Sequence, residues 1–251
     1  MSKTGDFLIA CARQYETVDF LRGDPSWFMH QVQGWQNQET MAFLAAALSY
    51  GSRRQFMSKI QFLADCTSGN PYRWVAEGLF ERDISDTSVA FYRFYTNARI
   101  LLFLRAYKDL LVEYQSIKGY LQAMHATTAM AAIEAITAWF SNRPSGGVVP
   151  QNASSSCKRL CMFLRWMVRK GSPVDLGLWN DLIDKRTLII PLDTHVLSEA
   201  RRLRLTHAKA PSMHVAREVT EKLKRYFPND PLQGDFAMFG YGVTHAKNLK
   251  F

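Results

Sequence analysis

Apolar residues recur along this chain at spacings of three and four, which is the period of an α-helix and not of a strand. The runs predict helices over residues 7–21, 39–50, 53–66, 97–114, 130–140, 156–170, 194–205, 212–227 and 232–243. Strand-like alternation is scarce, and its best example, 188–190, is too short to seed a sheet. The pattern therefore predicts an all-α protein of about ten helices.

The breaks between these runs support the same interpretation. Gly, Asn and Pro cluster at 23–25, 69–71 and 228–231, where they are expected to end one helix and begin the next. The longest break, 141–155, leads into the helix predicted from 156. With 251 residues the chain can bury a substantial core, either as one domain or as two closely packed lobes.

Composition excludes several classes of protein. Hydrophobic residues at 47% and aromatic residues at 13% are typical of a folded chain and exclude disorder of the whole. No apolar stretch approaches the roughly 20 residues that span a bilayer. Residues 1–10 contain Asp6 and lack a small-residue cleavage pattern, so a secretory signal is not expected. We expect a cytoplasmic protein that does not interact with membranes.

The four cysteines are Cys11, Cys66, Cys157 and Cys161, and none forms a C-x-x-C pair. The closest spacing is one helical turn, which suits packing better than metal binding, and the pattern disfavours an iron–sulfur cluster. No H-E-x-x-H or similarly compact ligand spacing occurs. The sequence predicts reduced structural thiols, no metal and no cofactor.

Positive charge is concentrated in the second part of the chain. The net charge is +9, yet residues 1–149 hold 14 Lys and Arg against 13 Asp and Glu. Residues 150–251 hold 17 against 9. A concentrated basic region indicates a polyanionic partner, with nucleic acid ahead of an anionic membrane. The alternative is a solvated basic surface that only aids solubility.

Part of this charge lies on the helix predicted over 156–170. Lys158, Met162, Arg165 and Arg169 follow one another at spacings of four, three and four, which places them on one stripe. The stripe carries three cations and is a candidate for contact with a phosphate backbone. The alternative is an ordinary solvated helix face.

Lys158 falls in or beside the first turn of that helix. The helix dipole disfavours a cation at this end, and the arginines nearby add like charge, so both effects favour the neutral amine. Only the free amine attacks carbon, which makes Lys158 a candidate nucleophile. An ordinary surface lysine would experience the same field. The formal S-x-x-K match at Ser155–Lys158 is discarded because a serine triplet makes it trivial.

Asp193 follows a proline and precedes a helical run, which is the position of an N-cap. Backbone N–H groups bonded to its carboxylate would keep it ionised. A carboxylate fixed at a helix start can also stabilise a nearby positive charge, so a structural and a functional role are compatible. His195, two residues on, suits hydrogen bonding or packing better than metal binding.

Around these residues the chain resembles the helix-hairpin-helix superfamily of DNA base-excision glycosylases, which includes endonuclease III and the 8-oxoguanine glycosylases. That superfamily places a catalytic lysine at the start of the helix after the hairpin, and a catalytic aspartate in a Val/Pro-x-Asp-x-His/Arg-Val stretch. Lys158 and Pro191-Leu192-Asp193-Thr194-His195-Val196 match these places. Residues 200–205 resemble the continuation, 158–167 is most similar to the archaeal 8-oxoguanine glycosylases, and 43–51 more weakly resembles the first core helix.

The resemblance implies a two-lobed helical unit of residues 1–251. Its central lobe is expected over 37–170, ending in an irregular helix-hairpin-helix, and its second lobe over 1–36 with 171–251. The implied partner is double-stranded DNA with a damaged base in the nucleoid, and the implied activity is base excision with AP-lyase cleavage. Lys158 would be the nucleophile and Asp193 the stabilising carboxylate.

Further site residues follow from this interpretation. Backbone contacts are expected from the segment before the lysine and from four arginines: Ser154, Ser155, Ser156, Arg165, Arg169, Arg201 and Arg202. A base pocket is expected around His195 and the last helix, with Asp235 for hydrogen bonding and Phe236 or Phe239 for stacking. Aromatic residues at such spacing are commonly core residues, which is the alternative for the two phenylalanines.

The chain departs from the superfamily in three respects. The usual Leu-Pro-Gly-Val-Gly hairpin is replaced by residues 149–156, the lysine and aspartate are 35 residues apart, and the four-cysteine cluster loop is missing. The whole chain also resembles a bacterial family of similar length that shares Lys-Arg-Leu-x-Met-x-Leu-Arg-Trp-Met-Val-Arg, matched at 158–169, and Pro-Leu-Asp-x-His. Two other functions remain open: an inactive nucleic-acid-binding protein on the same scaffold, and a helical interaction protein.

Overall fold

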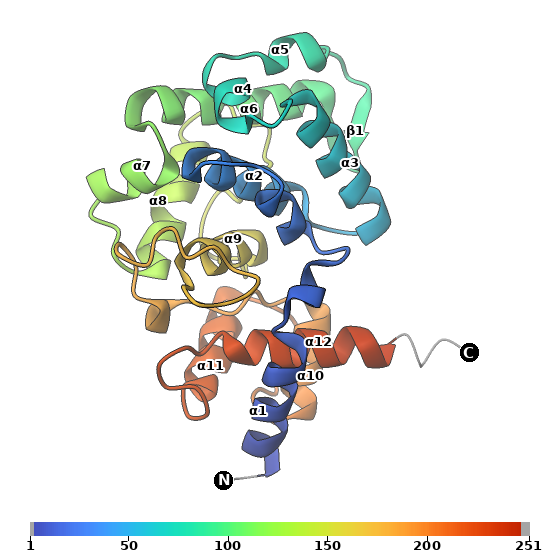
Figure 1. Cartoon of the computed structure of the whole chain (residues 1–251), viewed down its shortest axis with the longest axis vertical. Coiled ribbons are helices and arrows are strands. Elements are labelled where there is room, and N and C mark those ends of the chain that lie inside the picture. The colour runs from blue at the N-terminus through green and yellow to red at the C-terminus, as the bar shows by residue number, and fades with distance from the viewer. Residues whose placement is uncertain (1–2, 247–251) are drawn as a thin grey trace. The chain divides into compact units, whose positions relative to one another are not determined.

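The structure is a computed structural model that describes residues 3–246, and Figure 1 shows it as a succession of helices. The α-helices are α1 (Lys3–Tyr15), α2 (Trp35–Leu48), α3 (Arg53–Cys66), α4 (Pro71–Ala76), α5 (Phe80–Asp83), α6 (Asn97–Tyr114), α7 (Ile117–Ala123), α8 (Ala129–Ser141), α9 (Lys158–Val168), α10 (Thr194–Arg202), α11 (Met213–Leu223) and α12 (Gln233–Ala246). Short 3-10 helices are η1 (Val18–Leu21), η2 (Pro25–His30) and η3 (Lys185–Thr187). The predicted all-α class is confirmed.

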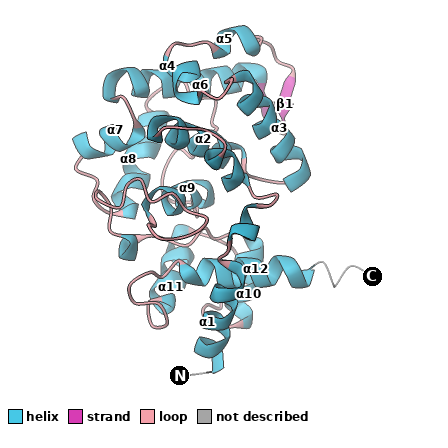
Figure 2. Ribbon diagram, viewed as in Figure 1, coloured by secondary structure: helices cyan, strands magenta, loops and turns pink. Residues whose placement is uncertain are grey.

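The described residues contain one small sheet, the antiparallel hairpin of β1 (Ala90–Tyr92) and β2 (Tyr95–Thr96). Figure 2 shows it as the magenta segment beside α3. The sequence pattern did not predict this hairpin, and the run at 188–190 is not a strand. Within residues 3–246, no helix combines the length and the apolar character needed to cross a bilayer.

The chain divides into two compact units. One comprises the residues up to Arg22, Thr128–Met130 and those from Ala153 onward, and the other comprises Gly23–Thr127 and Ala131–Asn152. We call them the terminal unit and the central unit. This division differs from the lobes expected from the sequence, which placed α9 with the central helices. Helix α9 belongs to the terminal unit because the ion-pair partners of Arg165 and Arg169 are Glu16 and three aspartates after residue 170, and its loop hydrogen bonds also come from residues after 170.

The central unit is built around α2. Ten of its fourteen residues are buried, which agrees with a helix that is apolar on nearly all sides. The ring of Phe43 packs against those of Phe103, Tyr107 and Phe140 from α6 and α8. The buried Glu39 carboxylate accepts the backbone N–H groups of Ile117 and Lys118, so α2 also caps the start of α7.

The terminal unit contains α1 and α9 to α12. Helix α12 packs against both α1 and α10, and Figure 1 shows α12 crossing α1. Every residue of α9 from Leu160 to Val168 is buried, Arg165 included. Helix α9 is therefore the core helix of this unit, and its first residue, Lys158, lies where it reaches the surface.

Candidate catalytic lysine and aspartate

Helix α9 begins abruptly at Lys158. The residue before it, Cys157, has a left-handed backbone with φ of +44°, and its side chain does not cap the helix. A non-glycine residue rarely adopts this conformation, so the turn is held by its surroundings. Ser155 contributes, since its Oγ accepts the backbone N–H of Cys157 at 3.4 Å. This turn therefore leads directly into the candidate lysine at the first position of α9.

Helix α10 begins at a conventional cap. Asp193 is extended, and its Oδ1 accepts the backbone N–H groups of His195 and Val196, each at 2.9 Å. Its second oxygen, Oδ2, lies 3.1 Å from Nζ of Lys158. The carboxylate is thus held by one oxygen and presented to the lysine by the other. The two side chains that the family resemblance assigns as nucleophile and stabilising carboxylate are therefore in direct contact.

The pair is partly open to solvent, with the lysine side chain 30% exposed and the aspartate side chain 21% exposed. Only the free amine attacks carbon. Attack by the amine therefore requires that Nζ first lose a proton. Oδ2 of Asp193 lies 3.1 Å from Nζ, which is close enough for the carboxylate to accept that proton.

Arg165 and Arg169 do not lie on a solvent-facing stripe, so the prediction that they contact phosphate was wrong. They are 4% and 2% exposed. Arg165 pairs with Asp175 and Asp235, both of which are buried. A charge enters a protein interior only with a partner, and here carboxylates from outside the helix supply it.

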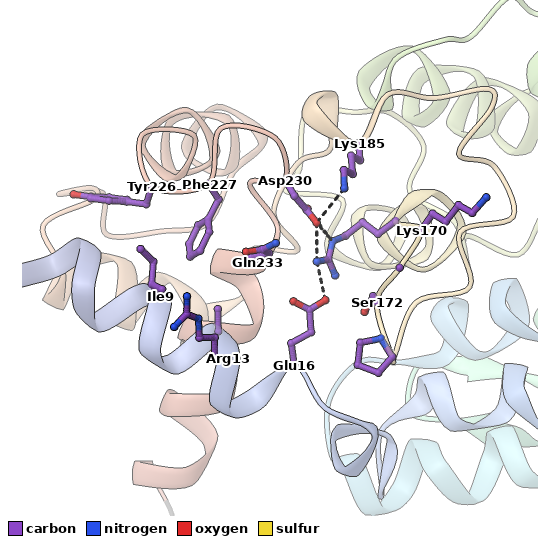
Figure 3. Close-up of a pocket in the computed structure, with 14 residues that line it drawn as sticks. Ile9, Arg13, Glu16, Lys170, Ser172, Lys185, Tyr226, Phe227, Asp230 and Gln233 are labelled. Carbon is purple, nitrogen blue, oxygen red and sulfur yellow. Dashed lines mark hydrogen bonds and ion pairs between the residues drawn. The ribbon is translucent and has the colours of Figure 1, made fainter. Parts of the chain in front are cut away.

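Arg169 is the centre of this buried network. Its guanidinium pairs with Asp175, Asp230 and Glu16, and Lys185 reaches Asp230 at 3.8 Å. Figure 3 shows the side chains of Glu16, Asp230 and Lys185 converging from separate segments. Burial raises the pKa of the Asp175 carboxyl above its ordinary value, while the two guanidinium groups act in the opposite direction. The network ties α1, α9 and the segment before α12 together.

The sequence around the two arginines indicates that they are buried. Trp166, Met167 and Val168 separate the two arginines, and cations within such an apolar run are expected to be buried with acidic partners. The partners themselves lie at positions 16, 175, 230 and 235, which no local pattern links to the helix.

The predicted base pocket in the last helix is also corrected. Asp235 and Phe236 are buried, and the Asp235 carboxylate is bonded to Arg165. The ring of Phe236 packs on Phe20 and lies 4.4 Å from the Arg165 guanidinium. Phe239 is half-buried and also contacts Phe20. These residues form core contacts because α12 turns this face toward the interior.

The family comparison covers both candidate residues. A family model described as "Protein of unknown function (DUF2400)" matches residues 24–244. The chain belongs to the DUF2400 family. A search of curated proteins and a search of solved structures found no match. The DUF2400 description assigns no activity, so the functional argument rests on the geometry of the site.

The other residues of this DUF2400 chain that were predicted to contact DNA differ in how exposed their side chains are. Ser154 and Ser155 are exposed and Ser156 is half-buried immediately before α9, while His195 is exposed at the first turn of α10. Arg201 is exposed too. Arg202 already pairs with Glu199, and its guanidinium lies over the rings of Phe7 and Tyr241. The roles of these residues in binding DNA stay predictions.

Two hollows of the terminal unit lie elsewhere. One, of about 540 Å³, is lined by α1, the loop after α9 and the residues before α12, as Figure 3 shows. The other, of about 520 Å³, is lined by Val168, Lys170 and residues 180–186. Lys158 and Asp193 line neither hollow.

The cysteines beside the lysine are expected to resist chemical modification. Cys157 and Cys161 are buried cysteines, and burial raises the pKa of both thiols. Because the thiolate is the reactive form, labelling by iodoacetamide should require unfolding. Peptide mass spectrometry of briefly labelled native protein should find modification first at Cys66, which is half-buried. Rapid labelling of Cys157 in folded protein would contradict the packing described for the start of α9.

Proposed function

We propose that this protein is a DNA glycosylase with AP-lyase activity that removes a damaged base, such as an oxidised purine, from duplex DNA. The observation that carries the proposal is the approach of Lys158 Nζ to Asp193 Oδ2 at 3.1 Å at the starts of two helices. An amine and a carboxylate at this separation are the groups that base displacement at C1′ requires.

The proposed reaction begins with the damaged nucleotide flipped out of the duplex, because C1′ is inaccessible within the stack. Asp193 accepts a proton from Nζ of Lys158. The lone pair freed on Nζ forms a bond to C1′, the bond from C1′ to the base breaks, and its electron pair leaves with the base, which takes up a proton. Asp193 passes the proton it has accepted to the departing base, and the carboxylate, ionised again, stabilises the positive charge that develops on the sugar.

The second stage explains strand cleavage. The nitrogen now bonded to C1′ loses a proton, and the lone pair so freed forms a C=N bond to C1′ while the C1′–O4′ bond breaks and the ring oxygen is protonated, which leaves a Schiff base. Loss of a C2′ proton then allows elimination of the 3′ phosphate. Borohydride reduces the C=N bond and makes the adduct permanent.

The proposal includes the two-lobed helical arrangement of the glycosylase superfamily with an irregular hairpin. Backbone N–H groups at the start of α9 and the hydroxyls of Ser154–Ser156 are the proposed phosphate contacts there. The Cys157 side chain does not cap this helix, and the start of a helix is a common binding place for anions.

The central unit has a separate feature that is typical of nucleic-acid-binding proteins. At the tip of the β1–β2 hairpin, Phe94 is 73% exposed, and the Arg93 guanidinium lies 5.5 Å from the centre of its ring. Arg99 donates to the Phe94 carbonyl and fixes the tip. An exposed aromatic ring beside arginines can stack on an unpaired base, which supports DNA as the partner.

The test is a borohydride trapping assay. The protein is incubated with duplexes that contain 8-oxoguanine, uracil or an abasic site, together with an undamaged duplex, and borohydride is added. We expect a covalent protein–DNA adduct with at least the abasic duplex. Lys158→Gln should form none, whereas Lys185→Gln, which alters another partly exposed lysine of the terminal unit paired with an aspartate, should trap normally.

The second candidate function is a nucleic-acid-binding protein without catalysis. The replacement of the usual hairpin by residues 149–156 favours it. Salt-sensitive retention of DNA with no adduct on any duplex would support this candidate and refute the glycosylase. Loss of both adduct and retention would instead support a helical interaction protein.

A further inference from the structure

Because Arg165 and Arg169 of the α9 region are buried, the exposed positive charge of the terminal unit must come from other residues. Residues 201–225 hold eight Lys and Arg against two Glu, a net charge of +6 out of +9 for the whole chain. This segment spans the end of α10, the loop that follows and all of α11. Most of the excess charge therefore belongs to one continuous stretch that is separate from the lysine–aspartate pair.

The acidic side chains of this region are already paired. Glu218 is bonded to Lys222 and Glu221 to Lys224, while Glu199 is bonded to Arg202. Within residues 3–246 the other five cations of the stretch have no ion-pair partner, and all five are exposed: Arg201, Arg204, Lys209, Arg217 and Arg225. The first four run from the last turn of α10 to the middle of α11, and we call them the basic loop patch. Exposed cations without acidic partners create a local positive potential.

The loop that carries the patch is ordered by its own hydrogen bonds. Thr206 Oγ1 donates to Glu218 at 2.9 Å and accepts the N–H of Ala208, which anchors the loop to α11. Ser212 caps α11 by accepting the N–H of Val215. Arg204 has φ of +58°, a left-handed conformation that is unusual for arginine. The cations are thus displayed on a fixed backbone.

Helix geometry extends the surface along α11. His214 and Arg217 are three residues apart, so they share one exposed face of the helix, and His207 is exposed in the loop. Imidazole and guanidinium groups both donate hydrogen bonds to phosphate oxygens. The start of α11 adds the positive end of a helix dipole to the same region.

We propose that the basic loop patch binds the phosphate backbone of duplex nucleic acid without reading its sequence. The charge complementarity identifies a polyanion, and the choice of nucleic acid as the occupant rests on the proposed function. The patch would hold the protein on undamaged DNA, whereas Lys158 and Asp193 would act only on a damaged nucleotide.

The test measures binding to an undamaged duplex as a function of salt, in a Lys158→Gln background that removes the proposed chemistry. Lys209→Ala with Arg217→Ala should make the negative slope of log K against log salt shallower by about 1.8, because each phosphate that the protein neutralises contributes about −0.9. The matched control is Lys3→Ala with Arg82→Ala, which removes the same charge from two other exposed cations and should leave the slope unchanged.

Each outcome decides the inference. Adding Arg204→Asn, whose side chain tolerates a left-handed backbone, should make the negative slope shallower still. An unchanged slope, or an equal change in the control, would overturn the patch, provided that circular dichroism shows all variants folded. Loss of binding to phosphatidylserine vesicles with DNA binding intact would also overturn it and indicate a membrane surface instead. Failure of borohydride trapping with the expected slopes would refute only the catalytic proposal.

Discussion

Asp193→Asn is expected to slow base release by about 10²- to 10³-fold, the usual cost of removing one group that stabilises charge in a transition state. The amide retains an oxygen that can accept the N–H groups of His195 and Val196, so the cap and the start of α10 should survive. It cannot take a proton from Nζ and carries no negative charge. Single-turnover excision on a damaged duplex measures the effect.

Asp184→Asn is the matched control. Asp184 also caps a helix, accepting the backbone N–H of Arg186, and it also pairs with a cation through its other oxygen. Its exposed position at η3 should make this change neutral for excision. Equal rates for Asp193→Asn and wild type would show that the carboxylate at α10 is only a cap.

Arg169→Met is expected to lower the free energy of unfolding by about 3–5 kcal/mol, the range for breaking a buried ion pair by removing one partner. The change leaves Asp175 and Asp230 buried without their main cation. Urea denaturation followed by circular dichroism measures the loss. Adding Asp175→Asn should recover part of it, since one uncompensated charge is removed.

Arg186→Met is the control for this stability prediction. Arg186 also pairs with an aspartate, but its side chain is 63% exposed, so the free energy of unfolding should change far less than for Arg169→Met. A similar small loss for Arg169→Met would mean that the buried network contributes little, and that apolar packing alone holds α9 in the terminal unit.

How far the sequence predicts the fold depends on element length. Helices such as α3 and α6 contain several turns with a clear apolar period, and their predicted limits agree with the structure. Helices α4 and α5 have six and four residues, too few for a period to emerge. The β1–β2 hairpin depends on side-chain contacts outside it, including the hydrogen bond from Tyr92 to the Tyr50 carbonyl, and these cannot be seen locally.

In the candidate site, too, only features that depend on neighbouring residues could be predicted from the sequence. Asp193 was predictable as a cap because capping involves only neighbouring residues, and its approach to Lys158 followed from the family resemblance. The prediction that Arg165 and Arg169 face solvent was wrong because periodicity places residues on one face of a helix without showing which face is buried. The carboxylates that neutralise those arginines come from distant segments, and only the fold brings them together.

The most direct test of the proposed chemistry is to locate the trapped adduct. Wild-type protein is reduced with borohydride on an abasic duplex, digested with protease and nuclease, and analysed by peptide mass spectrometry. The reduced sugar is expected on Lys158, in the peptide that begins α9. An adduct on another lysine or on the N-terminal amine, with Lys158 unmodified, would contradict the assignment of the nucleophile.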